Sequence, residues 1–153
     1  MLNLSNPQFV PILFPNDPLA DDIATFTKAI GCSDYWAEVT KEYGVGSATA
    51  TTPIQLSDDE TLLPLTGALD DSVIQSWLST QITAGLFGDA VSTQTVYAIF
   101  LPPGVTSALT GTLPQASCRD FHGYHSSFAL HDASTSVSYV VVPRCDTLKA
   151  AAG

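Results

Sequence analysis

The sequence predicts an α+β domain, a mixed β-sheet with about three helices packed against it. Apolar residues make up 45% of the 153 residues and charged residues only 13%, the opposite of the balance in a disordered chain. Stretches with helical spacing alternate with strand-like runs, and the last third holds two apolar strands around a Gly/His-rich segment. The length and the absence of an internal repeat fit one domain over residues 1–153.

The first elements are a strand and a helix. Residues 8–14 form an apolar run whose Pro11 lacks a backbone donor, which predicts an edge strand or a bulged one. Asp17 followed by Pro18 is typical of a helix start, with the aspartate as N-cap and the proline at the first helical position. Gly31 is the expected end of this helix.

A second helix is predicted over residues 34–43, capped by Ser33 and ended by Gly44. Its apolar face is expected to use Tyr35 or Trp36, together with Val39 and Tyr43. Residues 44–69 are rich in Gly, Ala, Thr and Pro and predict loop, with one short strand at 53–56. The acidic run 58–60 is interpreted as a solvated turn, because it lacks the spacing of a calcium loop.

The third helix is predicted over about residues 71–84, between the cap residue Asp70 and Gly85. Its buried face is expected to consist of Ile74, Trp77, Leu78, Gln81 and Ile82. We expect Trp77 to lie in the core and not to form a ligand platform. The strand 95–101 has the composition of a central strand covered on both faces. Strands 126–131 and 137–142 then predict a hairpin around a loop at 132–136.

Charge and hydropathy exclude several classes of partner. Five basic residues face fifteen acidic ones, giving a net charge of −10 with no basic cluster, which argues against nucleic acid and anionic membranes. No apolar run reaches the roughly 18 residues that a membrane-spanning helix needs. Residues 1–7 lack the features of a secretory leader. The protein is then either cytosolic or the mature part of a secreted, extracellular protein, and we favour the second interpretation.

Three cysteines are present, and two of them bracket the predicted hairpin. Cys118 and Cys145 are the candidate disulfide. In the chain-entropy model, closing a loop of this size stabilises the folded state by about 3 kcal/mol. Cys32 is left over, either as a buried thiol or as the partner of a residue outside this chain. The alternative is three reduced core cysteines, because free cysteine is often buried.

The histidines are the candidate metal ligands. His122, His125 and His131 lie close together in the sequence, and with Asp120 they could supply the three or four ligands that zinc requires. No His-Glu-x-x-His or Cys-x-x-Cys pattern supports a zinc site. The alternative is that these histidines are structural and hydrogen-bonded in a tight turn between two strands.

A hydrolase triad is a further possibility, with Ser126 or Ser127 as nucleophile, His125 as base and Asp132 as its partner. Triads depend on geometry, and residues adjacent in sequence seldom face one another. No Gly-x-Ser-x-Gly elbow is present. The carboxylate pair at 70–71 stands at a helix start, where the helix dipole explains it.

Five segments together resemble a known family: 33–36 (Ser-Asp-Tyr-Trp), 42–46 (Glu-Tyr-Gly-Val-Gly), 97–104 (Tyr-Ala-Ile-Phe-Leu-Pro-Pro-Gly), 121–126 (Phe-His-Gly-Tyr-His-Ser) and 139–145 (Tyr-Val-Val-Val-Pro-Arg-Cys). In this order they resemble the N-terminal half of secreted bacterial zincin-like proteins of the myxobacterial type. They are more distantly similar to the plant EXORDIUM-like, phosphate-induced proteins. The resemblance spans most of residues 8–146.

The resemblance implies one of two functions. In the zincin-like reading, the chain is the scaffold of a zinc-dependent metallopeptidase. It stops at residues 149–153, before the helix of the His-Glu-x-x-His type, so it is expected to be inactive alone and no catalytic residue carries over. In the EXORDIUM-like reading, it is a non-catalytic extracellular binding or cell-surface protein. A scaffold without that helix exposes an apolar face, which predicts a homo-oligomer or a protein partner.

Overall fold

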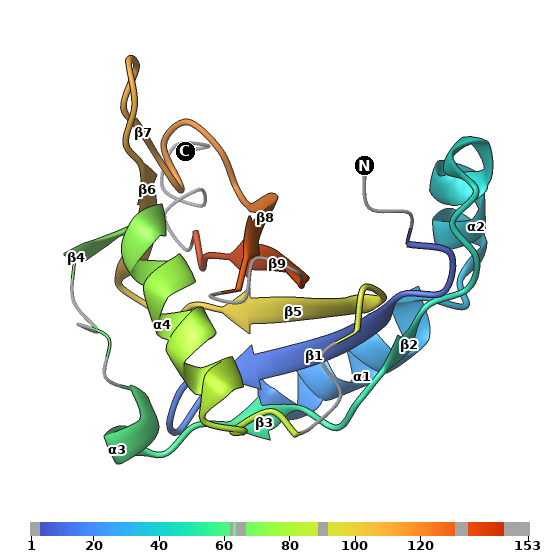
Figure 1. The fold of residues 1–153 in the computed structure, drawn as a ribbon, viewed down its shortest axis with the longest axis horizontal. Coiled ribbons are helices and arrows are strands. Elements are labelled where there is room, and N and C mark those ends of the chain that lie inside the picture. Colours follow the sequence, from blue (N-terminus) through green and yellow to red (C-terminus); the bar gives the residue numbers. More distant parts are fainter. Residues whose placement is uncertain (1–3, 62, 64–66, 89–91, 131–134, 146–153) are drawn as a thin grey trace, which may run out of the picture.

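The computed structural model describes residues 4–61, 63, 67–88, 92–130 and 135–145, and it confirms the α+β class. Two sheets are present among these residues (Figure 1). The larger sheet has the order β2-β1-β5-β9-β8, with β3 also paired to β1, and the smaller has the order β4-β6-β7. The strands are β1 (Gln8–Leu13), β2 (Thr49–Ala50), β3 (Ile54–Gln55), β4 (Gly67–Asp70), β5 (Thr95–Phe100), β6 (Val105–Leu109), β7 (Gln115–Ala116), β8 (Tyr124–Ala129) and β9 (Ser136–Val142).

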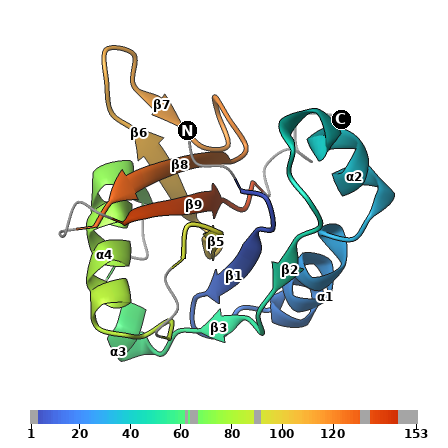
Figure 2. The same cartoon turned by 45° about the vertical axis from the view of Figure 1, so that its right-hand side comes forward.

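Helices lie on both faces of the larger sheet. They are α1 (Ala20–Ile30), α2 (Asp34–Thr40) with a 3-10 turn at Lys41–Tyr43, α3 (Asp58–Thr61) and α4 (Asp71–Thr83). Figure 2 shows α4 on one side of the sheet and α1 on the other. Side chains alternate between the two faces of a strand. Ile99 of β5 and Val141 of β9 are in one buried core cluster with Trp77 and Leu78 of α4.

Strand β5 is the central strand, as its composition predicts. It pairs in parallel with β1 on one side and with β9 on the other. Five of its six residues are buried. The predicted hairpin is also confirmed, since β8 pairs antiparallel with β9 over six residue pairs. The predicted loop at 132–136 lies largely outside the described residues.

The prediction that Pro11 marks an edge or bulged strand is wrong. Strand β1 lies inside the sheet, paired with β5 over its full length and with β2 and β3 on its other side. The carbonyl oxygens of Phe9 and Leu13 accept hydrogen bonds from Thr51 and Leu56 on the β2/β3 side. Backbone groups alternate between the two sides of a strand, so the backbone nitrogen of Pro11 also points to the β2/β3 side. It lies in the gap between these two short strands. The missing donor therefore breaks no ladder hydrogen bond.

Helix α1 begins later than predicted, at Ala20, and its N-cap Leu19 makes no side-chain cap. The carboxylate of Asp17 accepts a hydrogen bond from the Leu19 backbone at 2.8 Å. It also forms an ion pair with Arg144, which follows β9. Asp17 thus joins the turn after β1 to the end of β9, and the helix starts after that turn.

Helix α2 is capped as predicted but does not bury its predicted face. The Ser33 hydroxyl accepts a hydrogen bond from the Trp36 backbone at 3.1 Å, and Gly44 ends the segment at φ 67°. Tyr35, Val39 and Tyr43 are 68%, 45% and 76% exposed. Trp36 is the only predicted face residue that turns inward: it donates from Nε1 to the Gly46 carbonyl and packs against Phe9.

Helix α4 is confirmed over almost its full predicted length. Asp70 caps it through the Ser72 backbone, and all five residues of the predicted face are buried. Trp77 is 6% exposed and lies in the core between Phe14 and Phe87.

The region 44–69 holds more structure than the sequence predicts. Short strand β3 is confirmed, but β2 and β4 were predicted as loop. The acidic run at 58–60 forms the single-turn helix α3. Asp58 and Asp59 are exposed, so the run is solvated as predicted, but its backbone is helical. The Glu60 carboxylate accepts hydrogen bonds from both the backbone and the hydroxyl of Ser57, which explains why a helical turn starts there.

Candidate binding groove

A groove of about 870 Å³ lies along the larger sheet, between the start of β1, helix α2 and the β8–β9 hairpin. Among the described residues, half of the lining is apolar and the other half carries hydroxyl or imidazole groups, with no Asp, Glu, Lys or Arg. The lining residues are Leu4, Pro7, Phe9, Trp36, Thr40, Val45, Val96, His125, Ser126, Ser127, Ser136, Ser138, Tyr139 and Val140.

The strand register determines which hairpin side chains face the groove. His125 lies opposite Val140, and Ser127 lies opposite Ser138. Residues directly opposite one another in an antiparallel pair share a face, so these four form a row on the groove side. Ser126 and Tyr139 are a pair on the other face. Tyr139 accordingly reaches α4, where its hydroxyl meets Asp71.

The predicted triad residues are only partly brought together. His125, Ser126 and Ser127 all line the groove, but His125 and Ser126 point to opposite faces because they are adjacent on a strand. The structure shows no hydrogen bond between His125 and either serine. Asp132 lies outside the described residues. The groove therefore offers hydroxyl and imidazole groups for hydrogen bonding, with no nucleophile and base in contact.

The predicted zinc ligands are spread over a loop and a strand. His122 is exposed in the segment before β8, and His125 is exposed on β8. His131 lies outside the described residues. Among the residues that are described, no group of three or more His, Cys, Asp or Glu side chains is placed to hold a metal ion. A zinc site that includes His131 stays a prediction.

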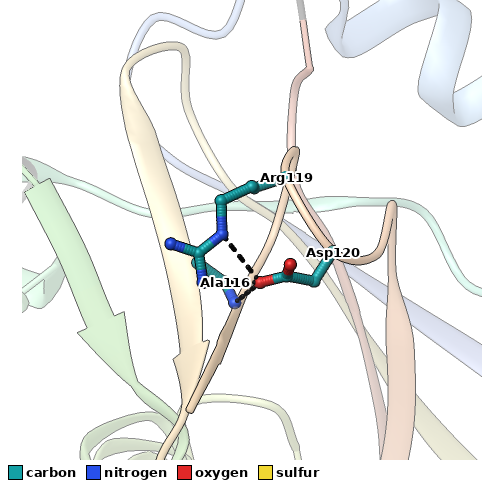
Figure 3. Close-up of polar contacts among 3 residues, drawn as sticks. All are labelled: Ala116, Arg119 and Asp120. Carbon is teal, nitrogen blue, oxygen red and sulfur yellow. Dashed lines mark hydrogen bonds and ion pairs between the residues drawn. The ribbon is translucent and has the colours of Figure 1, made fainter.

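Asp120 is held by its neighbours in the turn before β8 (Figure 3). Its Oδ2 accepts hydrogen bonds from the Ala116 backbone at 2.8 Å and from the Arg119 guanidinium at 2.9 and 2.7 Å. The hydrogen bond from Arg119, followed by that from Ala116, lowers the pKa of Asp120. This carboxylate thus closes the turn from β7 towards the hairpin.

The predicted disulfide between Cys118 and Cys145 is confirmed. It ties the turn before β8 to the segment after β9, so both ends of the hairpin are fixed to each other. Of the two alternatives for Cys32, the buried thiol is wrong, because this free cysteine is exposed in the α1–α2 connection. The reading of three reduced core cysteines is therefore also wrong.

Behind the groove, two tyrosine hydroxyls meet one carboxylate. Tyr124 and Tyr139 donate to Oδ1 of Asp71 at 2.6 and 2.7 Å, and Gln75 donates to its Oδ2 at 2.8 Å. Burial and then the hydrogen bond to Asp71 raise the pKa of Tyr139 to about 12. The same two causes raise the pKa of Tyr124. This cluster joins the first turn of α4 to both strands of the hairpin.

We expect this cluster to make the fold sensitive to alkali. Both tyrosines keep their protons in the folded state to a higher pH than in the unfolded state, where their pKa is about 10. The unfolded state therefore binds fewer protons above that pH, and the free energy of unfolding falls as pH rises from about 10 towards 12. Urea unfolding at a series of pH values measures this slope. The slope reports how many protons the chain releases on unfolding. Tyr139→Phe is expected to reduce this number by about one. An unchanged slope contradicts the role given to Tyr139.

Sequence reasoning missed several functional residues. Phe9 and Trp36 line the groove from segments far from the hairpin, and only Trp36 had a signal, as an alternative member of the α2 apolar face. Asp71 was explained by the helix dipole alone, although its tyrosine partners lie 53 and 68 residues away in the sequence.

Fold and groove together define a disulfide-linked α+β chain whose sheet carries a groove with no Asp, Glu, Lys or Arg among its described lining residues. In the part of the chain that the structure describes, no helix is long and apolar enough to span a bilayer. Comparison with protein-family models, curated proteins and solved structures found no match for this chain. The resemblance to zincin-like and EXORDIUM-like proteins therefore stays a prediction.

Proposed function

We propose that this chain is a non-catalytic, extracellular binding module, the function that its resemblance to EXORDIUM-like proteins implies. The observation that carries the proposal is the groove beside the hairpin. Its volume of about 870 Å³ falls in the range of small-molecule sites, which are mostly apolar with a few polar groups for orientation. The disulfide and the Asp71 cluster hold the hairpin wall of the groove in place.

The lining favours an uncharged ligand with both apolar and hydrogen-bonding surface. Phe9, Trp36 and Val96 offer apolar contact, while His125, Ser127 and Ser138 can donate or accept hydrogen bonds. A charged ligand would lose hydration without gaining an ion pair to the described lining, which holds no Asp, Glu, Lys or Arg. The net charge of −10 adds a further penalty for anions.

The apolar surface extends from the groove onto helix α2. Val39 is three residues from Trp36 and therefore its neighbour on the helix surface. Tyr35 and Tyr43 lie four residues to either side of Val39, and all three side chains are exposed. Exposed apolar surface of this kind, beside a groove, is typical of an interaction site. A ligand longer than the groove has further contacts available there.

The zincin-like peptidase scaffold is the other function that the resemblance implies, and it stays a prediction. Nothing in the geometry of the described residues favours it over a binding module, since His125 and the neighbouring serines make no catalytic contact.

A fluorescent probe tests the groove directly. We expect the uncharged dye N-phenyl-1-naphthylamine to bind the purified chain with about 1:1 stoichiometry and a blue-shifted emission, because half of the described lining of the groove is apolar. Ser138→Trp places a large ring on the groove side of β9 and is expected to weaken binding at least about tenfold, which corresponds to 1.4 kcal/mol. Titration of dye fluorescence measures the affinity.

The matched control is Ser76→Trp, which adds the same ring on an exposed position of α4. This variant is expected to bind the dye like the original chain. Thermal unfolding of both variants shows whether the fold is kept. If the original chain does not bind the dye, or if both variants bind it equally well, the groove is not the site and the proposal fails.

A further inference from the structure

Strand β8 is the last strand of the larger sheet, and no described strand pairs with its outer edge. The described residues pair it with β9 alone, over six consecutive pairs from Tyr124 to Ala129 without a bulge. Proteins commonly protect such edges with charged side chains, proline, bulges or covering loops. The six residues of β8 include no Asp, Glu, Lys, Arg or Pro. Figure 2 shows this strand at the end of the sheet, beyond β9.

The backbone groups on the free side of β8 follow from the ladder. The Leu130 N–H donates to the Thr135 carbonyl across the hairpin, so residue 130 and, by alternation, residues 124, 126 and 128 direct their backbone groups to β9. The N–H and C=O groups of His125, Ser127 and Ala129 therefore point away from the sheet. The structure gives these groups no partner among the described residues.

We propose that this edge binds a second copy of the same chain, with the two β8 strands antiparallel about a two-fold axis through Ser126. In this arrangement His125 of each copy lies opposite Ser127 of the other. These are residues with free backbone groups, so the two pairs exchange four N–H···O=C hydrogen bonds. The result is one sheet that runs continuously through both copies.

The sequence of β8 fits its own reversed copy at this register. Tyr124 and Phe128 are equally distant from Ser126, so each Tyr124 lies opposite the partner's Phe128. Aromatic cross-strand pairs contribute about 0.2–1 kcal/mol each relative to alanine. Both residues pack against the core and are only partly buried. The imidazole of His125 meets the hydroxyl of the partner's Ser127 on the groove side.

Charge makes this dimer weak at low salt. Each copy carries −10, and the two copies repel each other over long range. Raising the ionic strength from 0.1 to 1 M shortens the Debye length from about 10 to 3 Å. The dissociation constant is therefore expected to fall at higher salt. A contact of one strand per copy buries little surface. We therefore expect a weak dimer, with a dissociation constant of about 10 µM.

Disulfide trapping tests the register. In a Cys32→Ser background, Ser126→Cys places a thiol opposite its own copy, at a pair of the close, non-hydrogen-bonded type with Cα atoms about 4.5 Å apart. That spacing permits a disulfide. We expect air oxidation to give a covalent dimer with twice the chain mass of 16.1 kDa. Ser127→Cys is the matched control. In the proposed register, the two introduced cysteines are diagonal neighbours across the strands and too far apart to form a disulfide.

A proline on the free edge tests the contact without a cross-link. Ser127→Pro removes an N–H that makes no hydrogen bond to any described residue, and an edge strand tolerates this change. The variant is expected to stay folded and to remain monomeric in sedimentation velocity at concentrations where the original chain and Ser127→Ala are dimeric. Unchanged circular dichroism and thermal unfolding establish that the fold is kept.

Three results overturn the proposal. The first is a monomeric original chain at high salt and about 100 µM, well above the expected constant. The second is trapping through Ser127→Cys in place of Ser126→Cys, which means another register. The third is a folded Ser127→Pro variant that still dimerises. None of these results depends on whether the groove binds a ligand, so the two proposals succeed or fail separately.

Discussion

Replacing Asp17 with alanine is expected to lower the free energy of unfolding by about 3–5 kcal/mol, because it leaves a buried guanidinium without its counter-ion. The side chains of Asp17 and Arg144 are only 1% and 11% exposed. Arg144 donates to both carboxylate oxygens, and the same carboxylate holds the turn before α1 through Leu19. The loss of one aspartate therefore disturbs both the end of β9 and the start of α1. Urea unfolding followed by circular dichroism measures the change.

The double variant Asp17→Ala/Arg144→Met separates the ion pair from the packing. Removing both charges avoids the unpaired guanidinium, so we expect the double variant to recover much of the lost stability. The coupling energy of the double-mutant cycle then gives the contribution of the pair. If Asp17→Ala alone costs less than about 1 kcal/mol, the pair behaves like an exposed surface ion pair and the burial argument is wrong.

The parts of the fold that the sequence predicts are those governed by local periodicity. Helix α4 has a cap at Asp70 and a buried face at helical spacing, and both are seen as predicted. Strand β5 is apolar throughout and is central. The confirmed disulfide rests on the two cysteines that flank a recognisable hairpin. In each case the signal lies within one element or at its two ends.

The parts that the sequence does not predict depend on contacts between distant segments. Strands β2 and β4 have only two and four residues, too few for a periodic pattern, and they exist because β1 and β6 offer an edge to pair with. Pro11 is tolerated inside the sheet for a reason visible only once β2 and β3 are placed beside it. For β2, β4 and Pro11, the pairing partner decided the outcome and local rules gave the wrong answer.

The sequence pointed to the residues of only one wall of the groove, the wall formed by the β8–β9 hairpin. His125, Ser126 and Ser127 were candidate residues because of their chemistry, and they do line it. The opposite wall comes from Phe9 and Trp36, more than 80 residues earlier in the chain. Only the α2 packing brings Trp36 against Phe9. Chemistry-bearing residues can thus be listed from the sequence, whereas the shape that gives them a role requires the fold.

Asp71 is the clearest case of a residue whose role the sequence conceals, and its removal is the second large effect we expect. Asp71→Ala leaves the hydroxyls of Tyr124 and Tyr139 without their acceptor. An unsatisfied buried hydroxyl costs about 1–3 kcal/mol. Gln75 still contacts the Tyr139 hydroxyl at 3.0 Å and limits the loss at that residue. We therefore expect the free energy of unfolding to fall by about 2–4 kcal/mol in all.

Asp34→Ala is the matched control, because Asp34 is also the first residue of a helix but has no tyrosine partner in the structure. It loses only the favourable interaction of a carboxylate with the helix N-terminus, about 0.3–1 kcal/mol. Adding Tyr124→Phe to Asp71→Ala removes one of the two orphaned hydroxyls, so the pair of changes should cost less than the sum of the single changes. Equal losses for Asp71→Ala and Asp34→Ala would mean that the helix dipole alone explains Asp71. A larger loss at Asp71 that Tyr124→Phe partly relieves would establish it as the residue that joins α4 to the hairpin wall of the groove.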